Sequence, residues 1–137
     1  MLFLCVNDDV VLEHCLAKHF HQSGHQLIGA TTANEVFASL GTLAVHAVFA
    51  NLRLLRQKPL TLIEKLRAYR ENLPVIAMAN TEDFQLLAAA MERGATDFML
   101  LPVTRERLAQ VIDGVVQLAA SGRHFPLPET SRPDSSL

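Results

Sequence analysis

The stretch GATDFMLLP, residues 94–102, places a strand-like apolar run between a glycine and a proline. Gly94 is predicted to end a helix, Thr96–Leu101 to form a strand, and Pro102 to break that strand. An apolar run without regular polar alternation is typical of a strand that is buried on both faces of a parallel sheet. The stretch therefore predicts a sheet that is covered on both sides by helices.

The other short apolar runs of the chain fit the same pattern, because each is followed by a segment with helical spacing. The predicted strands are residues 2–6, 26–31, 44–52, 74–79 and 96–101. Helices are predicted from the polar residues 7–9 to Gly24, over residues 32–41 from a capping box, near residues 62–69, and over residues 81–93 and 104–119. Strands that alternate with helices predict an α/β domain with a doubly wound, five-stranded parallel sheet.

Several side chains are predicted to face the core. The inward stripe of the fourth helix is expected to be Phe84, Leu87, Ala88 and Met91. Cys5 lies in the first strand and Cys15 on a helical stripe, so both are predicted to be buried, reduced thiols of a cytoplasmic protein, with Cys5 inert. The histidines of the domain are predicted to be solvated, with a pH response as a minor hypothesis; they are His14, His19, His21, His25 and His46.

The composition excludes several classes of protein. With 50% hydrophobic and 19% charged residues, the 137-residue chain is too apolar to be disordered over most of its length. Its net charge of -2 argues against nucleic-acid binding by bulk charge. The apolar runs are too short to span a membrane, and the first residues lack the basic leader of a signal peptide, so a cytoplasmic location is predicted.

Ligands of a doubly wound sheet bind beyond the carboxyl ends of its strands. The predicted ends carry Asn7, Asp8 and Asp9 after the first strand, Asn51 after the third, and Leu101 after the fifth. No glycine-rich loop follows the first strand, so the usual cradle for a nucleotide or flavin phosphate is missing. No cofactor is predicted.

Four fragments, in this order and spacing, resemble the receiver domain of bacterial two-component response regulators. They are LFLCVNDD, HAVFANL, LPVIAMAN and GATDFMLLP, and the resemblance covers residues 1–119. It implies a flavodoxin-like fold with strand order 2-1-3-4-5. It also implies a module for signalling and protein interaction that is not an enzyme.

The resemblance also shows departures at the phosphorylation site. In the family, two acidic residues and a phosphoacceptor aspartate bind a divalent cation, and Thr or Ser and Lys contact the phosphoryl group. These positions are matched by Asn7 and Asp8, Asn51, Ala79 and Leu101. An amide cannot form an acyl phosphate, and Ala and Leu cannot bind a phosphoryl oxygen. The resemblance therefore implies a degenerate receiver, or pseudo-receiver, with a vestigial phosphorylation site.

Two readings stay open for several of these residues. Asp8 and Asp9 are weak metal-ligand candidates, but such residues more often cap a helix, and no metal is predicted because Mg²⁺ prefers several oxygen ligands. Asn51 either imitates a neutral aspartate or satisfies nearby backbone groups. Phe98 matches the switch aromatic of the family and is either turned inward beside Ala79 or simply core. Pro102 is a candidate cis proline.

The partners implied by the resemblance are a second copy of the chain and a covalently linked output domain. The face formed by the fourth helix, fifth strand and fifth helix is the usual dimerisation surface of the family, and both signs of charge on it suit a two-fold interface. Its candidate contact residues are Glu82, Glu92, Arg93, Asp97, Arg105, Arg107 and Gln110. The proline-rich residues 121–137 are predicted to be a linker or tail after a domain of residues 1–120.

Three alternatives are kept. A small-ligand sensor would use the vacated pocket at the strand ends, near the basic loop with Arg53, Arg56 and Lys58. A phospho-receiver would use a displaced acceptor, Asp8 or Asp9. A flavodoxin-type redox protein is the most distant alternative.

Overall fold

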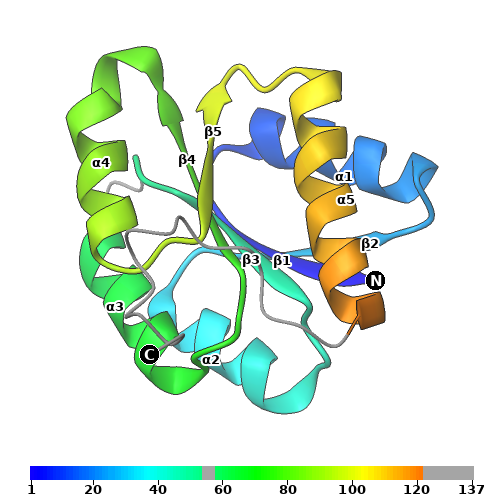
Figure 1. Ribbon diagram of the computed structural model, residues 1–137, viewed down its shortest axis with the longest axis horizontal. Coiled ribbons are helices and arrows are strands. Elements are labelled where there is room, and N and C mark those ends of the chain that lie inside the picture. The colour runs from blue at the N-terminus through cyan, green and yellow to red at the C-terminus, as the bar shows by residue number, and fades with distance from the viewer. Residues whose placement is uncertain (54–57, 122–137) are drawn as a thin grey trace, which may run out of the picture.

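The computed structural model describes residues 1–53 and 58–121, with side chains up to Leu118. Helices and strands alternate along the chain as predicted (Figure 1). The strands are β1 (Leu2–Val6), β2 (Gln26–Ala30), β3 (Ala47–Asn51), β4 (Val75–Asn80) and β5 (Asp97–Leu101). The helices are α1 (Val10–Gln22), α2 (Ala33–Thr42), α3 (Pro59–Tyr69), the short η1 (Thr81–Asp83), α4 (Phe84–Glu92) and α5 (Arg105–Ser121).

The strands form one parallel sheet in the order β2-β1-β3-β4-β5. Helices α1 and α5 cover one face of the sheet, and α2, α3 and α4 cover the other (Figure 1). Each face has its own hydrophobic core, because successive strand residues point to opposite faces. The predicted fold class and strand order are confirmed, and all five strand C-termini meet at one edge of the sheet.

The α1–α5 core is built around aromatic rings. The ring of Phe3 in β1 lies 5.0 Å from that of Phe20 in α1 and 5.8 Å from that of Phe49 in β3, measured between ring centres. Phe20 and Phe49 are 5.3 Å apart. Such close, tilted aromatic contacts add to the stabilisation that burial of the rings already gives. They fix α1 against the middle of the sheet, and with it the loop that joins β1 to α1.

The predicted helix ends are confirmed by their caps. The Thr32 and Glu35 pair forms a complete capping box at the start of α2. Gly24, just beyond α1, has a φ of +82° and Gly94, just beyond α4, has a φ of +118°. These left-handed conformations strain any residue with a Cβ atom, so both glycines are suited to end a helix.

Two predictions about the core are wrong. Phe84 and Ala88 are exposed, because Thr81–Asp83 forms a separate turn and α4 buries Leu87 and Ala90 instead. Ala88 is one residue, or about 100° of helix rotation, from Leu87, and it therefore faces outward.

The predicted burial of both cysteines is correct for one of them. Cys5 is fully buried in β1, where desolvation raises the pKa of its thiol to about 12. Cys15 is exposed, because it lies beside Leu16, which occupies the buried stripe of α1. Both cysteines are free.

The predicted tail, residues 121–137, lies outside the described residues apart from Ser121, the last residue of α5. Within the described part of the chain, no helix has the length and apolar character needed to cross a membrane.

Candidate functional site

Two asparagines lie at the edge of the sheet where the parallel strands end. Asn7 follows β1 and Asn51 ends β3, and these strands are neighbours in the sheet. Asn7 is 2% exposed and Asn51 is 5% exposed. Because buried polar groups require hydrogen-bond partners, the contacts of these two amides define the site.

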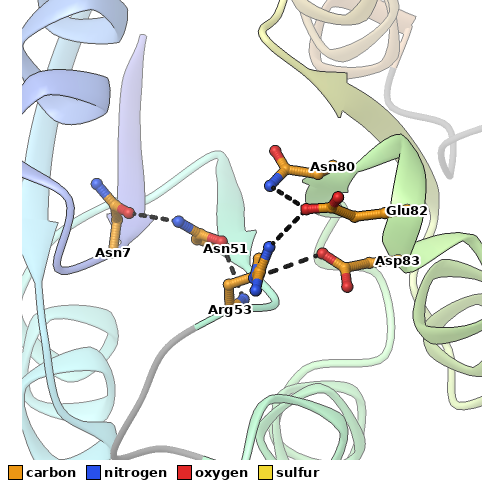
Figure 2. Close-up of polar contacts among 6 residues, drawn as sticks. All are labelled: Asn7, Asn51, Arg53, Asn80, Glu82 and Asp83. Atoms are coloured by element: carbon orange, nitrogen blue, oxygen red, sulfur yellow. Dashed lines mark hydrogen bonds and ion pairs between the residues drawn. The ribbon is translucent and has the colours of Figure 1, made fainter.

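The two amides form a continuous chain of hydrogen bonds between two loops. Asn51 Nδ2 donates to Asn7 Oδ1 at 2.7 Å (Figure 2), and Asn7 Nδ2 donates to the carbonyl oxygen of Asp9 at 2.7 Å. The backbone N–H of Arg53 donates to Asn51 Oδ1 at 3.0 Å. Both amide oxygens and both amide nitrogens therefore have partners, and the chain carries no charge.

The side chain of Arg53 links this network to the turn after β4. Its Nη1 lies 2.9 Å from Glu82 Oε1 and its Nε lies 3.5 Å from Asp83 Oδ2 (Figure 2). Asn80 Nδ2 donates to the same Glu82 oxygen at 3.4 Å. Asp83 Oδ2 is buried and accepts no hydrogen bond from the described residues, so the nearby guanidinium is what compensates its charge.

The carboxylates next to Asn7 differ in their surroundings. Asp9 caps α1, because its Oδ1 accepts a hydrogen bond from the backbone N–H of Leu12 at 3.1 Å. Asp8 is exposed. The divalent cation that typical members of the resembled family bind does not fit these residues, because Asn51 turns its Nδ2 donor toward Asn7 and Asp8 alone offers an uncommitted carboxylate. Across residues 1–53 and 58–121, no group of three or more His, Cys, Asp or Glu residues could hold a metal ion.

The residues that match the hydroxyl and lysine positions of the family, Ala79 in β4 and Leu101 in β5, are apolar. Ala79 is fully buried in the core under α2, α3 and α4, and Phe98 packs against this core as a half-buried side chain. Leu101 packs against the core on the opposite, α1–α5 side of the sheet. The peptide bond between Leu101 and Pro102 is cis. At residues 79 and 101, apolar packing takes the place of hydrogen-bonding groups, and the polar side chain at the end of β4 is that of Asn80.

The sequence profile of the response regulator receiver domain matches residues 3–113 of the chain. The chain belongs to this family. Among curated relatives, the virulence transcriptional regulatory protein PhoP of Salmonella typhimurium is 29% identical over 102 residues, which cover 74% of the chain and 46% of PhoP. The C4-dicarboxylate transport transcriptional regulatory protein DctD of Rhizobium meliloti is 26% identical over 105 residues, which cover 77% of the chain and 23% of DctD. The receiver therefore spans less than half the length of these relatives.

Solved structures agree with this assignment. The receiver domain of NtrX from Brucella abortus superposes with a TM-score of 0.79 at 26% identity, covering 84% of the chain and 98% of that domain. The receiver domain of the TMAO respiratory system regulator TorR gives a TM-score of 0.79 at 18% identity, covering 85% of the chain and 96% of that domain. At such low identity, the TorR match shows the shared fold alone.

Several of the predicted interface charges of the receiver make contacts within the chain. Arg107 Nη2 lies 2.9 Å from Asp97 Oδ1 and donates to the carbonyl oxygen of Phe98 at 2.8 Å. The guanidinium carbon of Arg107 lies 6.0 Å from the centre of the Phe98 ring, within the range of a cation–π contact. Arg93 pairs with Glu64 at 3.4 Å. These groups are thus already partnered within one molecule.

The same face carries exposed apolar side chains that the sequence analysis missed. Phe84, the first residue of α4, is 65% exposed, and Leu100 in β5 is 39% exposed. Five of the seven predicted contact residues are also exposed: Glu82, Glu92, Arg93, Arg105 and Gln110. No sequence signal separates these apolar residues from core residues, because the exposure of Phe84 depends on where α4 begins and that of Leu100 depends on the place of β5 at the edge of the sheet.

The histidines differ from the prediction. His14 and His21 are exposed, but His19, His25 and His46 are half-buried. His25 Nδ1 lies 2.9 Å from the amino group of Met1, and desolvation followed by that positive charge lowers the pKa of His25. His46 Nδ1 accepts a hydrogen bond from the backbone N–H of Leu2 at 3.1 Å. Both lie at the amino end of β1, away from the strand-end site.

The basic loop after β3 also differs from an open, anion-attracting loop. Arg53 is paired with the carboxylates of Glu82 and Asp83, so its charge is largely offset. Lys58 is exposed, and Arg56 lies outside the described residues. The pairing of Arg53 joins residues that are 29 positions apart, and no local sequence pattern predicts it.

Proposed function

We propose that this receiver functions without phosphorylation, as a non-catalytic interaction module joined to an output domain. The observation that carries the proposal is the buried hydrogen bond from Asn51 Nδ2 to Asn7 Oδ1 at 2.7 Å. An amide nitrogen whose lone pair is delocalised into its carbonyl is a poor nucleophile, and the Asn51 oxygen already accepts from Arg53. The group at residue 51 is thus occupied on both sides.

The electrostatics of the site support the same conclusion. A phosphorylation site of the family gathers carboxylates that a cation and a lysine must offset, whereas Asn7, Asn51 and Leu101 remove both signs of charge together. The remaining carboxylates are poorly placed as a displaced acceptor. Asp9 is committed to the cap of α1, and Asp8 faces solvent.

Intact-mass measurement after incubation with Mg²⁺ and a small phosphodonor tests the proposal. We expect the receiver to gain no phosphoryl group, whereas the quadruple variant Asn7→Asp, Asn51→Asp, Ala79→Thr, Leu101→Lys gains one. The quadruple variant is the matched control, because it restores the second acidic residue, the phosphoacceptor, the hydroxyl and the ammonium group that the family uses. A phosphoryl group on the unmodified chain, mapped to Asp8 or Asp9, would contradict the proposal and favour a displaced acceptor.

The face formed by α4, β5 and α5 is proposed to bind a second copy of the chain. Its exposed apolar side chains, Phe84 and Leu100, and its exposed Glu92, Arg105 and Gln110 offer an interface both apolar contacts and polar groups of both charge signs. A surface that is self-complementary in this way suits a two-fold dimer.

Sedimentation over a range of protein concentrations tests this second part. We expect a monomer–dimer equilibrium that Phe84→Asp weakens by about tenfold or more, since the substitution would bury a carboxylate in the interface. Leu43→Asp is the control, because Leu43 is 44% exposed and follows α2 on the other side of the molecule. A chain that stays monomeric at high concentration, or equal effects of both variants, would exclude this interface.

The proposed output is regulation of transcription in the cytoplasm. PhoP and DctD are named as transcriptional regulators, and the receiver covers 46% and 23% of their lengths. Each relative thus has further chain beyond its receiver. A linked output domain would allow the receiver to act through assembly instead of through chemistry.

A further inference from the structure

A cavity of about 370 Å³ lies between α1 and the start of α5. Both helices pack on the same face of the sheet, and Figure 1 shows α5 crossing in front of α1. The volume falls within the range of roughly 300–1,000 Å³ that is typical of small-ligand sites. The residues that line the cavity do not include Asn7, Asn51 or Arg53, so it is distinct from the strand-end site.

The cavity has an apolar floor and a basic rim. Its accessible apolar surface comes from the half-buried Val103, which precedes α5, whereas Leu16 and Leu108 also line it but are almost completely buried. Lys18 and Arg105 line it from the two helices and are exposed, and His19 adds a half-buried imidazole. No Asp or Glu is among the lining residues. A ligand here would meet cationic groups from two sides and apolar surface below.

The two cations are available to a ligand. Among the residues that the structure describes, neither Lys18 nor Arg105 forms an ion pair with a carboxylate. Arg105 is also the first residue of α5, where the helix dipole adds partial positive charge. By contrast, the Arg53 and Arg107 side chains are already paired with acidic residues. Cations that line a cavity without a carboxylate partner attract an anion.

We infer that this cavity binds a small organic anion, whose carboxylate or phosphate group lies between Lys18 and Arg105 and whose apolar part contacts Val103. The inference goes beyond the proposed function and does not depend on it: the cavity shares no residue with the strand-end network, and it shares only Arg105 with the residues assigned to the face that is proposed to dimerise. A bound anion would bridge α1 to α5, and α5 belongs to the face that is proposed to dimerise. The site would thus give a ligand a route to the assembly of the receiver.

Amide NMR titrations with phenyl phosphate test the site directly. We expect saturable shifts of the resonances of Lys18, His19 and Arg105, with a dissociation constant of roughly 1 mM or below. Benzyl alcohol, which has the ring without the charge, is expected to cause no such shifts. Inorganic phosphate, which has the charge without the ring, is expected to bind about tenfold more weakly. No saturable shift with phenyl phosphate would overturn the inference, and equal affinity for inorganic phosphate would overturn the assignment of an organic ligand.

Variants at the rim separate this site from general attraction to a basic surface. Lys18→Gln together with Arg105→Gln is expected to weaken phenyl phosphate binding by about tenfold or more. Lys65→Gln is the matched control, because Lys65 is an exposed lysine on α3 that does not line the cavity. Both substituted rim residues are exposed, so their thermal unfolding is expected to match that of the parent. An equal loss of affinity in the Lys65→Gln variant would overturn the inference.

The reactivity of the Cys15 thiol provides an independent measurement of ligand binding in the same cavity. It lines the cavity and is exposed, whereas Cys5, the other cysteine of the chain, is fully buried. We expect a dianionic aromatic disulfide reagent to react with Cys15 and phenyl phosphate to slow that reaction saturably. The double rim variant should react more slowly with the dianionic reagent but at an unchanged rate with a neutral dipyridyl disulfide. Absence of protection by phenyl phosphate would contradict the site.

Discussion

Asn51 faces Asn7 with a nitrogen and faces Arg53 with an oxygen. The direction of these hydrogen bonds is fixed along the chain, because Asn7 Nδ2 donates to the Asp9 carbonyl oxygen and leaves Asn7 Oδ1 as the acceptor for Asn51. Each amide thus fixes the orientation of the next. A carboxylate has no donor to offer in such a chain. The identity of one buried atom at residue 51 thus determines whether the loops after β1 and β3 are joined by a hydrogen bond or separated by repulsion.

The Asn51→Asp variant is predicted to be less stable than the parent by about 1–3 kcal/mol near neutral pH, because an ionised oxygen would replace the donor that faces Asn7 Oδ1. Burial raises the folded-state pKa of the introduced carboxyl. The variant therefore regains stability as the pH falls and the introduced carboxyl becomes protonated. It loses that stability again as the pH rises through the folded-state pKa. Urea unfolding at several pH values measures the difference.

Asn72→Asp is the control for this prediction, because Asn72 is exposed in the turn before β4. That variant should change the free energy of unfolding by less than about 0.5 kcal/mol. A buried-site variant that is as stable as the parent at neutral pH would show that the hydrogen bond between the two asparagines contributes little.

At the scale of helices and strands, the sequence predicts those features that depend on residues close together in the chain. The apolar runs locate the strands, Gly24 and Gly94 locate two helix ends, and the capping box locates the start of α2. The exposure of Phe84 escapes prediction, because it depends on how η1 and α4 divide one helical segment. The partners of Arg53 also escape it, because the sheet brings β3 and β4 together only after folding. For the strand-end site, the sequence predicts which residues lie there, but it does not predict the hydrogen bonds between their side chains.

The capping box of α2 is expected to make the stability of the fold depend on pH. Glu35 Oε1 accepts hydrogen bonds from Thr31 N, Thr31 Oγ1 and Thr32 N, and these bonds, that of the Thr31 backbone foremost, lower the pKa of Glu35. A carboxyl with a lowered folded-state pKa stabilises the fold above its unfolded pKa, and this contribution is lost as the pH falls. Glu35→Gln should therefore reduce the loss in Tm between about pH 7 and about pH 3.

Glu92→Gln serves as the comparison for this acid dependence, since Glu92 is an exposed carboxylate on α4. Its loss of Tm on acidification should equal that of the parent. If Glu35→Gln and the parent lose the same Tm, the hydrogen bonds of the capping box do not contribute to acid unfolding.

At the scale of the whole molecule, one arginine joins segments that are far apart in the sequence. The guanidinium of Arg67 in α3 donates to the carbonyl oxygens of Gly94, Glu71 and Leu73 and to Thr96 Oγ1. Thr96 Oγ1 in turn accepts from the backbone N–H of Val75 at the start of β4. One side chain thus ties together the end of α3, the start of β4 and the loop before β5.

Arg67→Ala is predicted to destabilise the fold by roughly 2–4 kcal/mol, because several partly buried acceptors would lose their donor at once. The denaturant midpoint should fall while the slope of the transition stays the same. Arg93→Ala is the matched control: its surface pair with Glu64, at 3.4 Å, should contribute less than about 1 kcal/mol. Equal effects of the two variants would show that Arg67 acts only through surface charge.

The amide at residue 51 also affects how long an activated state of the receiver would last. An acyl phosphate hydrolyses, so a receiver with a phosphorylated aspartate returns to its unphosphorylated state after a limited time. Under the proposed function, a chain with Asn51 bonded to Asn7 forms no acyl phosphate. Under the proposed function, its activity at any moment would follow how much of the protein the cell has made and what is bound to it, with no memory of an earlier stimulus.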